Sequence, residues 1–592
     1  MYGCNGQFAL YTPINLMSIA SLAVAISMGL TLTACNGDSV DATPQFVQSA
    51  QTCTALKSKR IDASLIGEPT TGAVVTAATY LSGVPDTPNA AGTAIVQATP
   101  DYCQVQMDIS PVDNAAPVIK AQVNLPTNWN GKKLQFGGGG FNGTLITGVQ
   151  PSRNAPANVP IPLTQGYMTA GTDSGHQTLV GGDSFSFALN SEALTNFAYA
   201  AYKKTNDVAI QIGLLYYGKK PTKSYYMGAS EGGREAMTMA QRYPNDYDGI
   251  VAIDPVMNWS GLQTFGNYVG GILQSKPGGW LNGKSQLVHD TVVSACDALD
   301  GITDGVVSNY FTCKPVADAA LAAKRCPSGG DEGSQCFSDA QLAVINQAHS
   351  GYQFDFARAS GMTVYAGFNY GSEGLPGNWE RWMTGTVSPT TGPSTTGISQ
   401  LYAYGNGYVR YFIAQNSNFD PLTYNPDTYK DRVVQVSNIM DATNPDLTAF
   451  FNRGGKLILR EDMGDSAQSP FTGLNYWNAV VAKMGQATVS KFFAAYVSTG
   501  LPHTSGGVAA GTKNAPSYGT PGSVDLLPLL EAWSEKGVAP SDSYMLVNTQ
   551  PLPPYAVTAS KPMCRYGTYP RYTGADASGG SNGANYACVT GS

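Results

Sequence analysis

A serine flanked by glycines offers the clearest chemistry in this chain. Ser230 is the centre of a Gly-x-Ser-x-Gly segment, residues 228–232. Residues 224–227 before it are typical of a short strand, and residues 234–240 after it have helical spacing. A serine in such a strand–turn–helix is held at strained backbone angles with its hydroxyl above the sheet, where it can act as a nucleophile. An ordinary glycine–serine turn is the alternative, and the flanking strand and helix favour the nucleophile.

A nucleophilic serine needs a base, and histidine is the usual base near neutral pH. The chain has four histidines: His176, His289, His349 and His503. In α/β-hydrolases the chain order is nucleophile, acid and then histidine, which excludes His176. His503 follows a strand-like run at residues 492–497, on the kind of loop that presents a catalytic histidine. We therefore expect His503 to be the base, with a surface-loop histidine as the alternative.

An acid should orient this histidine and stabilise its protonated form. It should follow the preceding strand, which is predicted at residues 457–460. Glu461, Asp462 and Asp465 come directly after that strand. Spacing alone leaves Asp462 and Asp465 as nearly equal candidates.

Backbone N–H groups should stabilise the oxyanion that forms when the serine attacks a carbonyl. The residue after the nucleophile, Glu231, is one expected donor. The second should come from the glycine run 137–140, which follows a predicted strand at 133–136. A flexible hinge is the alternative for this run, and a phosphate loop is disfavoured because no Lys-Ser/Thr pair follows it.

A second cluster of polar residues lies at positions 297–306. Asp297, Asp300 and Asp304 place three carboxylates within eight residues, with glycines between them. Such carboxylates repel one another unless a hard cation lies among them, and aspartate and carbonyl oxygens suit Ca²⁺. The spacing is not that of an EF-hand, so a structural calcium site is expected, with a solvated acidic turn as the alternative.

The elements that position these residues alternate between strands and helices from about Ala121 to Ile253. This alternation predicts an α/β fold with a parallel sheet covered by helices on both faces. Regularity is lost over residues 255–445, which are too long for a loop and are predicted to be an inserted lid domain. The core is therefore expected in two parts, residues 53–254 and 446–592.

The N-terminal residues resemble an export signal. Residues 16–32 are mostly apolar and lead into Leu32-Thr33-Ala34-Cys35, which is similar to a bacterial lipobox. We expect residues 1–35 to be a signal peptide, Cys35 to be lipidated, and residues 36–52 to be a tether. An ordinary cleaved signal with an incidental Cys35 is the alternative, and residues 1–20 depart from both types because they contain no Lys or Arg. The protein is thus predicted to be exported, as an outer-membrane lipoprotein or a periplasmic or secreted protein.

The cysteine count agrees with export. Eight cysteines remain outside the signal region, an even number that favours disulfides in an oxidising compartment. Pairing between sequence neighbours predicts Cys53–Cys103, Cys296–Cys313, Cys326–Cys336 and Cys564–Cys588. The net charge of −7 and the lack of Lys/Arg clusters argue against nucleic acid as a partner.

Together these segments resemble the tannase and feruloyl esterase family, which includes bacterial enzymes that hydrolyse mono(2-hydroxyethyl) terephthalate. The motifs that carry the resemblance are residues 230–235, 247–252, 296–301 and 454–459, and His503 with Ser505-Gly506-Gly507.

The resemblance implies an α/β-hydrolase core with a large lid that closes over an aromatic acyl group. It assigns the acid to Asp465 and the oxyanion donors to Gly138 and Glu231. It also implies structural Ca²⁺ in the lid. The implied ligands are the side chains of Asp297, Asp300 and Asp304 and the carbonyls of Ile302 and Val306.

Two departures from the family pattern concern the active site. The family typically has cysteines just before the serine and just after the histidine, where this chain has Ala229 and Thr504. We expect the triad to be kept and its loops to be held by packing instead of a disulfide. Glu461 stands where the family often has histidine, and with Asp462 it is expected to disfavour anionic substrates.

The predicted function is a serine esterase that acts on small esters of aromatic acids such as ferulate or gallate. One alternative is hydrolysis of terephthalate monoesters, although no lid arginine could be assigned to the terephthalate carboxylate. The other is a non-catalytic surface-binding protein on a hydrolase fold.

Overall fold

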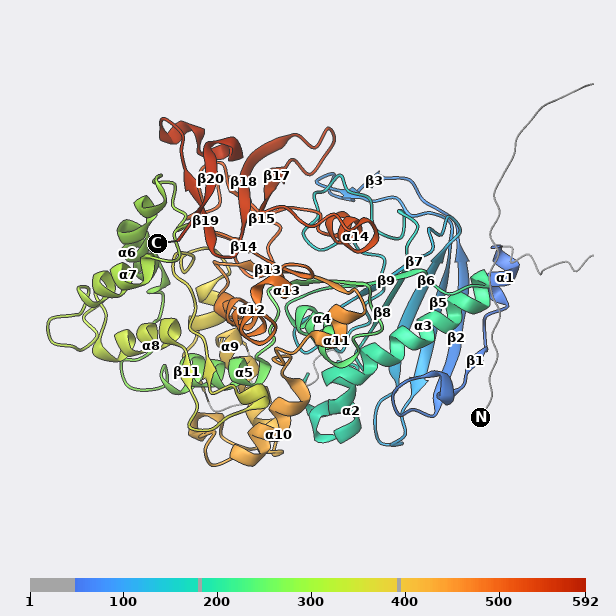
Figure 1. Cartoon of the computed structure of the whole chain (residues 1–592). Coiled ribbons are helices and arrows are strands. Elements are labelled where there is room, and N and C mark those ends of the chain that lie inside the picture. Colours follow the sequence, from blue (N-terminus) through green and yellow to red (C-terminus); the bar gives the residue numbers. More distant parts are fainter. Residues whose placement is uncertain (1–47, 179–183, 391–395, 592) are drawn as a thin grey trace, which may run out of the picture. The chain divides into compact units, whose positions relative to one another are not determined.

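A twelve-stranded mixed sheet is the frame that positions the predicted site (Figure 1). The computed structural model describes residues 48–178, 184–390 and 396–591. The predicted signal peptide, Cys35 and residues 36–47 of the predicted tether lie outside the described residues. In sheet order the strands are β1 (Arg60–Ile61), β2 (Gly72–Leu81), β5 (Tyr102–Ser110), β6 (Ile119–Pro126), β8 (Met168–Thr172), β7 (Lys132–Phe136), β9 (Lys223–Ala229), β10 (Gly249–Ile253), β13 (Lys456–Asp462), β14 (Phe493–Ser498), β18 (Val557–Arg565) and β17 (Ser543–Thr549).

The six central strands, β8 to β14 in sheet order, are parallel to one another. Strands that are covered on both faces of a sheet need apolar side chains on both faces. In β10 all five residues are buried. The carboxyl ends of β9, β13 and β14 lie on one edge of the sheet because these strands are parallel. The predicted α/β fold is confirmed.

Antiparallel strands flank this centre on both sides and were not predicted. On one side β1, β2, β5 and β6 pair in antiparallel order, and on the other β18 pairs with β14 and β17. In β5 the buried residues Cys103, Val105, Met107 and Ile109 alternate with more exposed ones. This alternation is typical of a strand at the margin of a core.

Helices cover both faces of the parallel centre. On one face α4 (Glu231–Arg242) and α12 (Pro470–Met484) pack against Ile250 and Leu457. On the other face α14 (Leu527–Lys536) packs against the neighbouring residues Val251 and Ile458, as the alternation of side chains along a strand requires. The helix α3 (Ala201–Tyr217) covers β5, β6 and β8. Among the residues that the structure describes, no helix combines the length and apolar character needed to cross a bilayer.

The predicted lid, residues 255–445, falls between the adjacent strands β10 and β13. Figure 1 shows its helices gathered on the side away from β1 and β2. They are α5 (Trp259–Asn267), α6 (Ser285–Cys296), α7 (Cys313–Ala322), α8 (Asp339–Ser350), α9 (Gln400–Gly407) and α10 (Lys430–Met440). These helices share one large apolar cluster, which includes Trp259, Val344 and Val436 and extends to Phe141 and Phe197 of the first core part.

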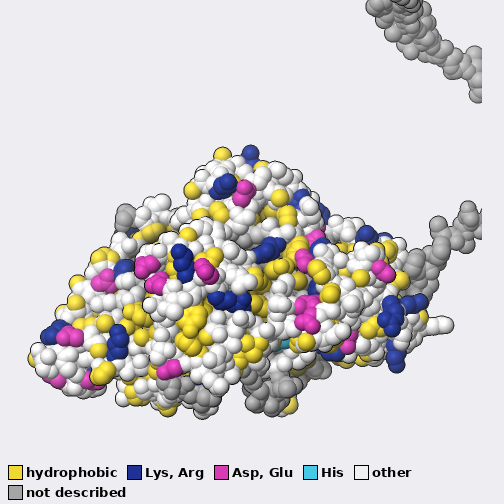
Figure 2. Space-filling view, turned by 90° about the horizontal axis from the view of Figure 1, so that it is seen from below, with side chains coloured by type: hydrophobic (Ala, Val, Ile, Leu, Met, Phe, Trp, Pro, Cys, Tyr) yellow, Lys and Arg dark blue, Asp and Glu magenta, His cyan; other side chains and the backbone are white. Residues whose placement is uncertain are grey.

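Charged side chains are spread over the surface. Figure 2 shows basic and acidic side chains scattered over one face, with no continuous basic patch on that face.

The four predicted disulfides are confirmed. Cys53–Cys103 ties α1 (Ala50–Thr54) to β5, and Cys296–Cys313 joins α6 to α7. Because α1 begins at Ala50, the folded body starts slightly before the predicted end of the tether. Cys564–Cys588 ties β18 to β20 (Tyr586–Thr590).

Replacing Cys53 and Cys103 by serine is expected to lower the free energy of unfolding by about 2–4 kcal/mol, because the cross-link restricts the unfolded chain. Replacing Cys326 and Cys336 by serine should lower the free energy of unfolding less, because that disulfide spans 10 residues whereas Cys53–Cys103 spans 50. Urea unfolding of the two double variants and the native protein measures both values. Equal stability of the first variant and the native protein would contradict this expectation.

Candidate active site

Ser230 lies at a sharp turn between β9 and α4, as predicted from the sequence. Its backbone angles, φ 61° and ψ −124°, are strained for a residue with a side chain. Its N–H donates to the carbonyl of Ile253 on the next strand, at 2.9 Å. The turn depends on its glycines, because a Cβ at Gly228 would lie 2.0 Å from the carbonyl oxygen of Gly232. This tight approach of helix to strand presents the Ser230 hydroxyl at the end of the sheet.

The structure brings Ser230, His503 and Asp465 into one hydrogen-bonded chain. His503 Nε2 lies 2.8 Å from Ser230 Oγ, and His503 Nδ1 lies 2.6 Å from Asp465 Oδ2. The other carboxylate oxygen of Asp465 accepts the N–H groups of Ala467 and Gln468, at 2.7 and 3.0 Å. Asp465 is buried, so these bonds hold its carboxylate in one orientation. A proton on Nδ1 leaves Nε2 free to accept the serine proton.

Asp465, of the three candidates that spacing left open, is the one that contacts the histidine. The strand β13 continues through Glu461 and Asp462, and both side chains are fully buried. Asp462 Oδ1 accepts a hydrogen bond from Arg460 Nε at 2.8 Å, and Glu461 Oε2 accepts one from Gln468 at 2.9 Å.

The expectation that Glu461 and Asp462 repel anionic substrates is not supported by their positions. Burial and the neighbouring Asp254 raise the pKa of Glu461 well above its usual value. Asp462 forms an ion pair with Arg460, and both side chains are fully buried. Neither carboxyl group therefore presents an exposed negative charge to the site.

The other three histidines lie outside this hydrogen-bonded chain. His176 stacks on Phe187 with ring centres 3.8 Å apart, and His349 stacks on Tyr370 at 3.6 Å. Burial lowers the pKa of both His176 and His349 to about 4. His289 is buried in the lid.

Hydrogen bonds hold the loop of His503 where the family pattern has a disulfide. The N–H of Thr504 donates to Asp254 Oδ2 at 2.7 Å, and Arg153 Nη2 donates to Thr504 Oγ1 at 2.6 Å. These hydrogen bonds act in addition to the packing that was expected to replace the disulfide. Asp254 and Arg153 were not predicted as site residues, although Asp254 directly follows β10, at the edge of the sheet where ligands bind.

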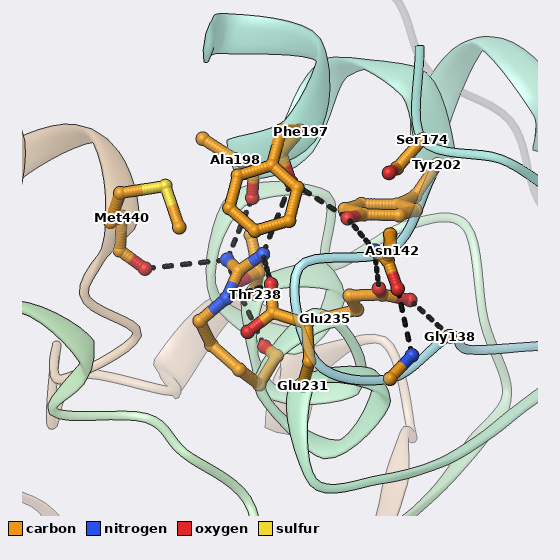
Figure 3. Close-up of polar contacts among 12 residues, drawn as sticks. Gly138, Asn142, Ser174, Phe197, Ala198, Tyr202, Glu231, Glu235, Thr238 and Met440 are labelled. Atoms are coloured by element: carbon orange, nitrogen blue, oxygen red, sulfur yellow. Dashed lines mark hydrogen bonds and ion pairs between the residues drawn. The ribbon is translucent and has the colours of Figure 1, made fainter. Parts of the chain in front are cut away.

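The expected oxyanion donors differ in availability. Glu231 is the first residue of α4, so its N–H has no partner within the helix. The N–H of Gly138, however, donates to Glu235 Oε2 at 3.1 Å, as Figure 3 shows. The N–H of Gly139 likewise donates to Asn142 Oδ1 at 2.7 Å. As the structure stands, the predicted Gly138 donor is occupied by Glu235.

A buried ion pair fixes Glu231 beside the nucleophile. Arg234 Nη2 and Nε lie 2.5 and 2.8 Å from Glu231 Oε1. The same guanidinium donates to the carbonyls of Ala198 and Met440, at 2.7 and 3.3 Å (Figure 3). Arg234 thus joins the start of α4 to the end of the lid helix α10.

A small, largely apolar cavity borders Ser230. Most of its wall comes from the lid, and one lid residue, Trp382, also meets His503 edge-on with ring centres 5.8 Å apart. The residues that line it are Gly140, Phe141, Ser230, Glu231, Val256, Trp259, Leu262, Gln263, Trp382, Leu401, Tyr404, Ala467 and His503. Aromatic and aliphatic walls of this kind suit a planar apolar group.

The predicted calcium ligands lie on one loop of the lid, residues 297–306, where the carboxylates accept N–H groups of the same loop. Asp297 and Asp300 are buried, and Asp304 Oδ2 lies 3.6 Å from Lys561 Nζ, which is also buried. Burial raises the pKa of Asp300 to about 6 and also raises that of Asp297. Three carboxylates facing a single ammonium leave unbalanced negative charge, so the donor set fits a hard cation.

The tightest group of metal-ligating atoms among the described residues lies elsewhere. Asp254, Asp465 and His503 have ligand atoms within 4.8 Å of one another, and the loop aspartates do not form such a group. Both nitrogens of His503 already contact Ser230 and Asp465. The group of Asp254, Asp465 and His503 is therefore better described as part of a proton-transfer site than as a metal centre.

Comparison with known proteins agrees with this geometry. Residues 103–589 match the family Tannase and feruloyl esterase. The chain is 34% identical to an uncharacterized esterase of Agrobacterium fabrum, over 90% of this chain and 92% of that protein. It is 29% identical to the mono(2-hydroxyethyl) terephthalate hydrolase of Piscinibacter sakaiensis, over 91% and 92% of the two chains. The crystal structure of feruloyl esterase B from Aspergillus oryzae superposes with a TM-score of 0.71 at 23% identity, covering 91% of this chain and 100% of that chain. This chain belongs to the tannase and feruloyl esterase family.

Proposed function

We propose that this protein is a serine carboxylic-ester hydrolase that acts on esters of aromatic acids. The observation that carries the proposal is the hydrogen-bonded chain from Ser230 through His503 to Asp465, at 2.8 and 2.6 Å, beside an aromatic cavity. Family membership supports the reaction class, and the cavity supports a planar acyl group such as feruloyl or galloyl.

In the proposed reaction Ser230 Oγ attacks the ester carbonyl carbon while His503 Nε2 takes its proton. The resulting imidazolium is stabilised by Asp465. When the carbonyl re-forms, the ester C–O bond breaks and His503 gives the proton to the departing alcohol, leaving an acyl-serine. Water then attacks the acyl-serine by the same route and releases the aromatic acid.

The oxyanion of each tetrahedral intermediate would be held by backbone N–H groups. Glu231 is the first donor in this proposal. The glycine run 137–140 would supply the second. Gly138 can be this donor only if its N–H breaks its hydrogen bond to Glu235 and bonds to the oxyanion instead. Gly140 is the alternative donor in the run, because it lines the cavity beside Ser230.

A panel of methyl ferulate, methyl p-coumarate, methyl gallate and mono(2-hydroxyethyl) terephthalate tests the proposal. We expect the highest kcat/KM with one of the methyl esters of a phenolic acid. Hydrolysis of the terephthalate ester alone would reject the feruloyl or galloyl assignment, and hydrolysis of none would reject the reaction class.

Terephthalate monoesters are a second candidate because a lid arginine lies near the cavity. The guanidinium carbon of Arg381 lies 5.1 Å from the ring centre of Trp382, which lines the cavity. Arg381 is exposed and lies behind Trp382 rather than among the lining residues, so a carboxylate would pair with it only by reaching past that ring. The similar hydrolase from Piscinibacter sakaiensis also supports this candidate.

We further propose a structural calcium ion at the lid loop. The carboxylates of Asp297, Asp300 and Asp304 and the carbonyls of Ile302 and Val306 would hold it. Its role would be to neutralise the carboxylates and keep the 297–306 loop in place, with no part in the ester chemistry.

Removing calcium with EDTA is expected to lower the melting temperature at pH 7.5 by about 3 °C, and added Ca²⁺ should restore it. The effect should shrink at pH 5. An unfolded aspartate has a pKa of about 3.9, whereas folding raises that of Asp300 to about 6. The metal-free folded state therefore binds more protons than the unfolded state between these values, and its stability falls as the pH rises through them.

Differential scanning fluorimetry and elemental analysis of the purified protein measure both effects. Asp300→Asn should abolish the response to EDTA, whereas Asp290→Asn, on an exposed face of α6, should keep it. A protein without bound calcium whose melting temperature ignores both EDTA and Ca²⁺ would reject the site.

We also propose export, with lipidation of Cys35 as an outer-membrane anchor. The four disulfides support an oxidising compartment. Mass spectrometry of the mature N-terminus distinguishes a lipidated Cys35 from an ordinary cleavage product.

A further inference from the structure

A second and larger cleft borders Ser230. Its volume is about 680 Å³, and among the described residues Ser230 is the one that lines both this cleft and the aromatic cavity. Its walls come from the core: the glycines 137–139, the segment 150–155, Ala229, and the loop of Thr504 and Gly506. An ester bound at Ser230 has two halves, so an acyl group in the aromatic cavity would leave its alcohol half facing this cleft.

Three consecutive polar residues, Ser152, Arg153 and Asn154, line one wall of the cleft. Ser152 Oγ and Asn154 Nδ2 are buried atoms with no hydrogen-bond partner among the described residues. The side chain of Arg153, between them in the sequence, is exposed, and its contacts to Thr504 are made by Nη2. Because Ser152 and Asn154 are the more buried neighbours, the exposed guanidinium of Arg153 is the donor that a ligand in the cleft can reach.

Arg153 is the charged residue among those that line the cleft. The nearest carboxyl groups, Asp254 and Asp462, are fully buried beneath it. Asp462 pairs with Arg460, and Asp254 accepts the N–H groups of Thr504 and Asp462. The positive charge of Arg153 is therefore directed to the cleft and is not neutralised by an exposed acid there.

Small side chains leave this space open. Ala229 and Thr504 line the cleft at the two positions where the family pattern has a disulfide. Thr504 is held by Arg153 and Asp254 instead of by a sulfur bridge, so the guanidinium lies next to the histidine loop.

We propose that this cleft binds the alcohol half of the ester, and that the preferred alcohol is a hydroxy acid whose carboxylate pairs with Arg153. The proposal rests on the proposed esterase function of Ser230. Arginine suits this role because its planar fork binds a carboxylate through two hydrogen bonds.

Two esters that differ only in charge test the proposal: O-feruloylglycolate, which carries a carboxylate, and O-feruloylglycolamide, its neutral isostere. For the native enzyme we expect kcat/KM to be about tenfold or more higher for the glycolate, since a hydrogen-bonded charge pair is worth about one factor of ten. Arg153→Gln should bring the ratio of the two kcat/KM values close to one, mainly through the KM of the glycolate. Arg60→Gln, an exposed arginine on β1, should keep the native ratio.

The ratio separates binding from support of the histidine loop. If Arg153 acted only by holding Thr504, Arg153→Gln would lower both kcat/KM values by the same factor, and the unchanged ratio would overturn the proposal. A native enzyme that prefers the glycolamide, or hydrolyses methyl ferulate but neither test ester, would also overturn it. If methyl ferulate is not hydrolysed either, the proposed function itself fails.

Discussion

Replacing Ser230 by alanine is expected to lower kcat for methyl ferulate by about 10⁵-fold or more, as loss of a serine nucleophile does in other triads. The hydroxyl lies 2.8 Å from His503 Nε2, and without it no acyl-enzyme can form. The remaining rate would come from the oxyanion donors and from binding alone. Progress curves at high enzyme concentration measure both rates.

The control is Ser490→Ala, which removes an exposed hydroxyl far along the chain from the site. Its kcat should equal that of the native enzyme. Circular dichroism should show that the Ser230→Ala variant is folded. A folded Ser230→Ala enzyme within tenfold of the native kcat would contradict the proposed mechanism.

Replacing Asp465 by asparagine is expected to lower kcat by about 10³–10⁴-fold. The amide has nearly the shape of the carboxylate, but its NH₂ group favours the imidazole tautomer with the proton on Nε2. That tautomer cannot accept the Ser230 proton. Stopped assays of methyl ferulate hydrolysis at several pH values measure the loss.

Asp462→Asn is the matched comparison because spacing made Asp462 an equal candidate. This change weakens the buried pair with Arg460, so it is expected to reduce stability by about 3 kcal/mol and kcat of the folded enzyme much less. Both variants should be assayed well below their melting temperatures. A larger loss of kcat in Asp462→Asn than in Asp465→Asn would show that Asp462, and not Asp465, is the catalytic acid.

The strand–turn–helix at Ser230 could be predicted because its signal is local. Glycines at fixed offsets, an apolar run before them and helical spacing after them all act within about fifteen residues. Spacing could not separate Asp462 from Asp465, since the choice depends on where β13 ends. The strand continues through Asp462, and only the turn after it brings a carboxylate to His503.

Contacts between segments that are far apart in the chain could not be predicted from the sequence. Arg153 and Asp254 meet Thr504 across 351 and 250 residues, so no local pattern marks them. The antiparallel order of the flanking strands could not be predicted, because the pairing of β2 with β5 joins segments that no local pattern connects. The occupied N–H of Gly138 likewise follows from Glu235, 97 residues away, whose carboxylate reaches the glycine run.

Labelling with a fluorophosphonate, followed by mass spectrometry of the tryptic peptides, tests the central claim most directly. Such a probe forms a stable bond only with a serine that an adjacent base activates. We expect one label per chain, on Ser230, and none in the Ser230→Ala variant. A folded native protein that stays unlabelled, or is labelled at another serine, would contradict the account and favour a non-catalytic binding role.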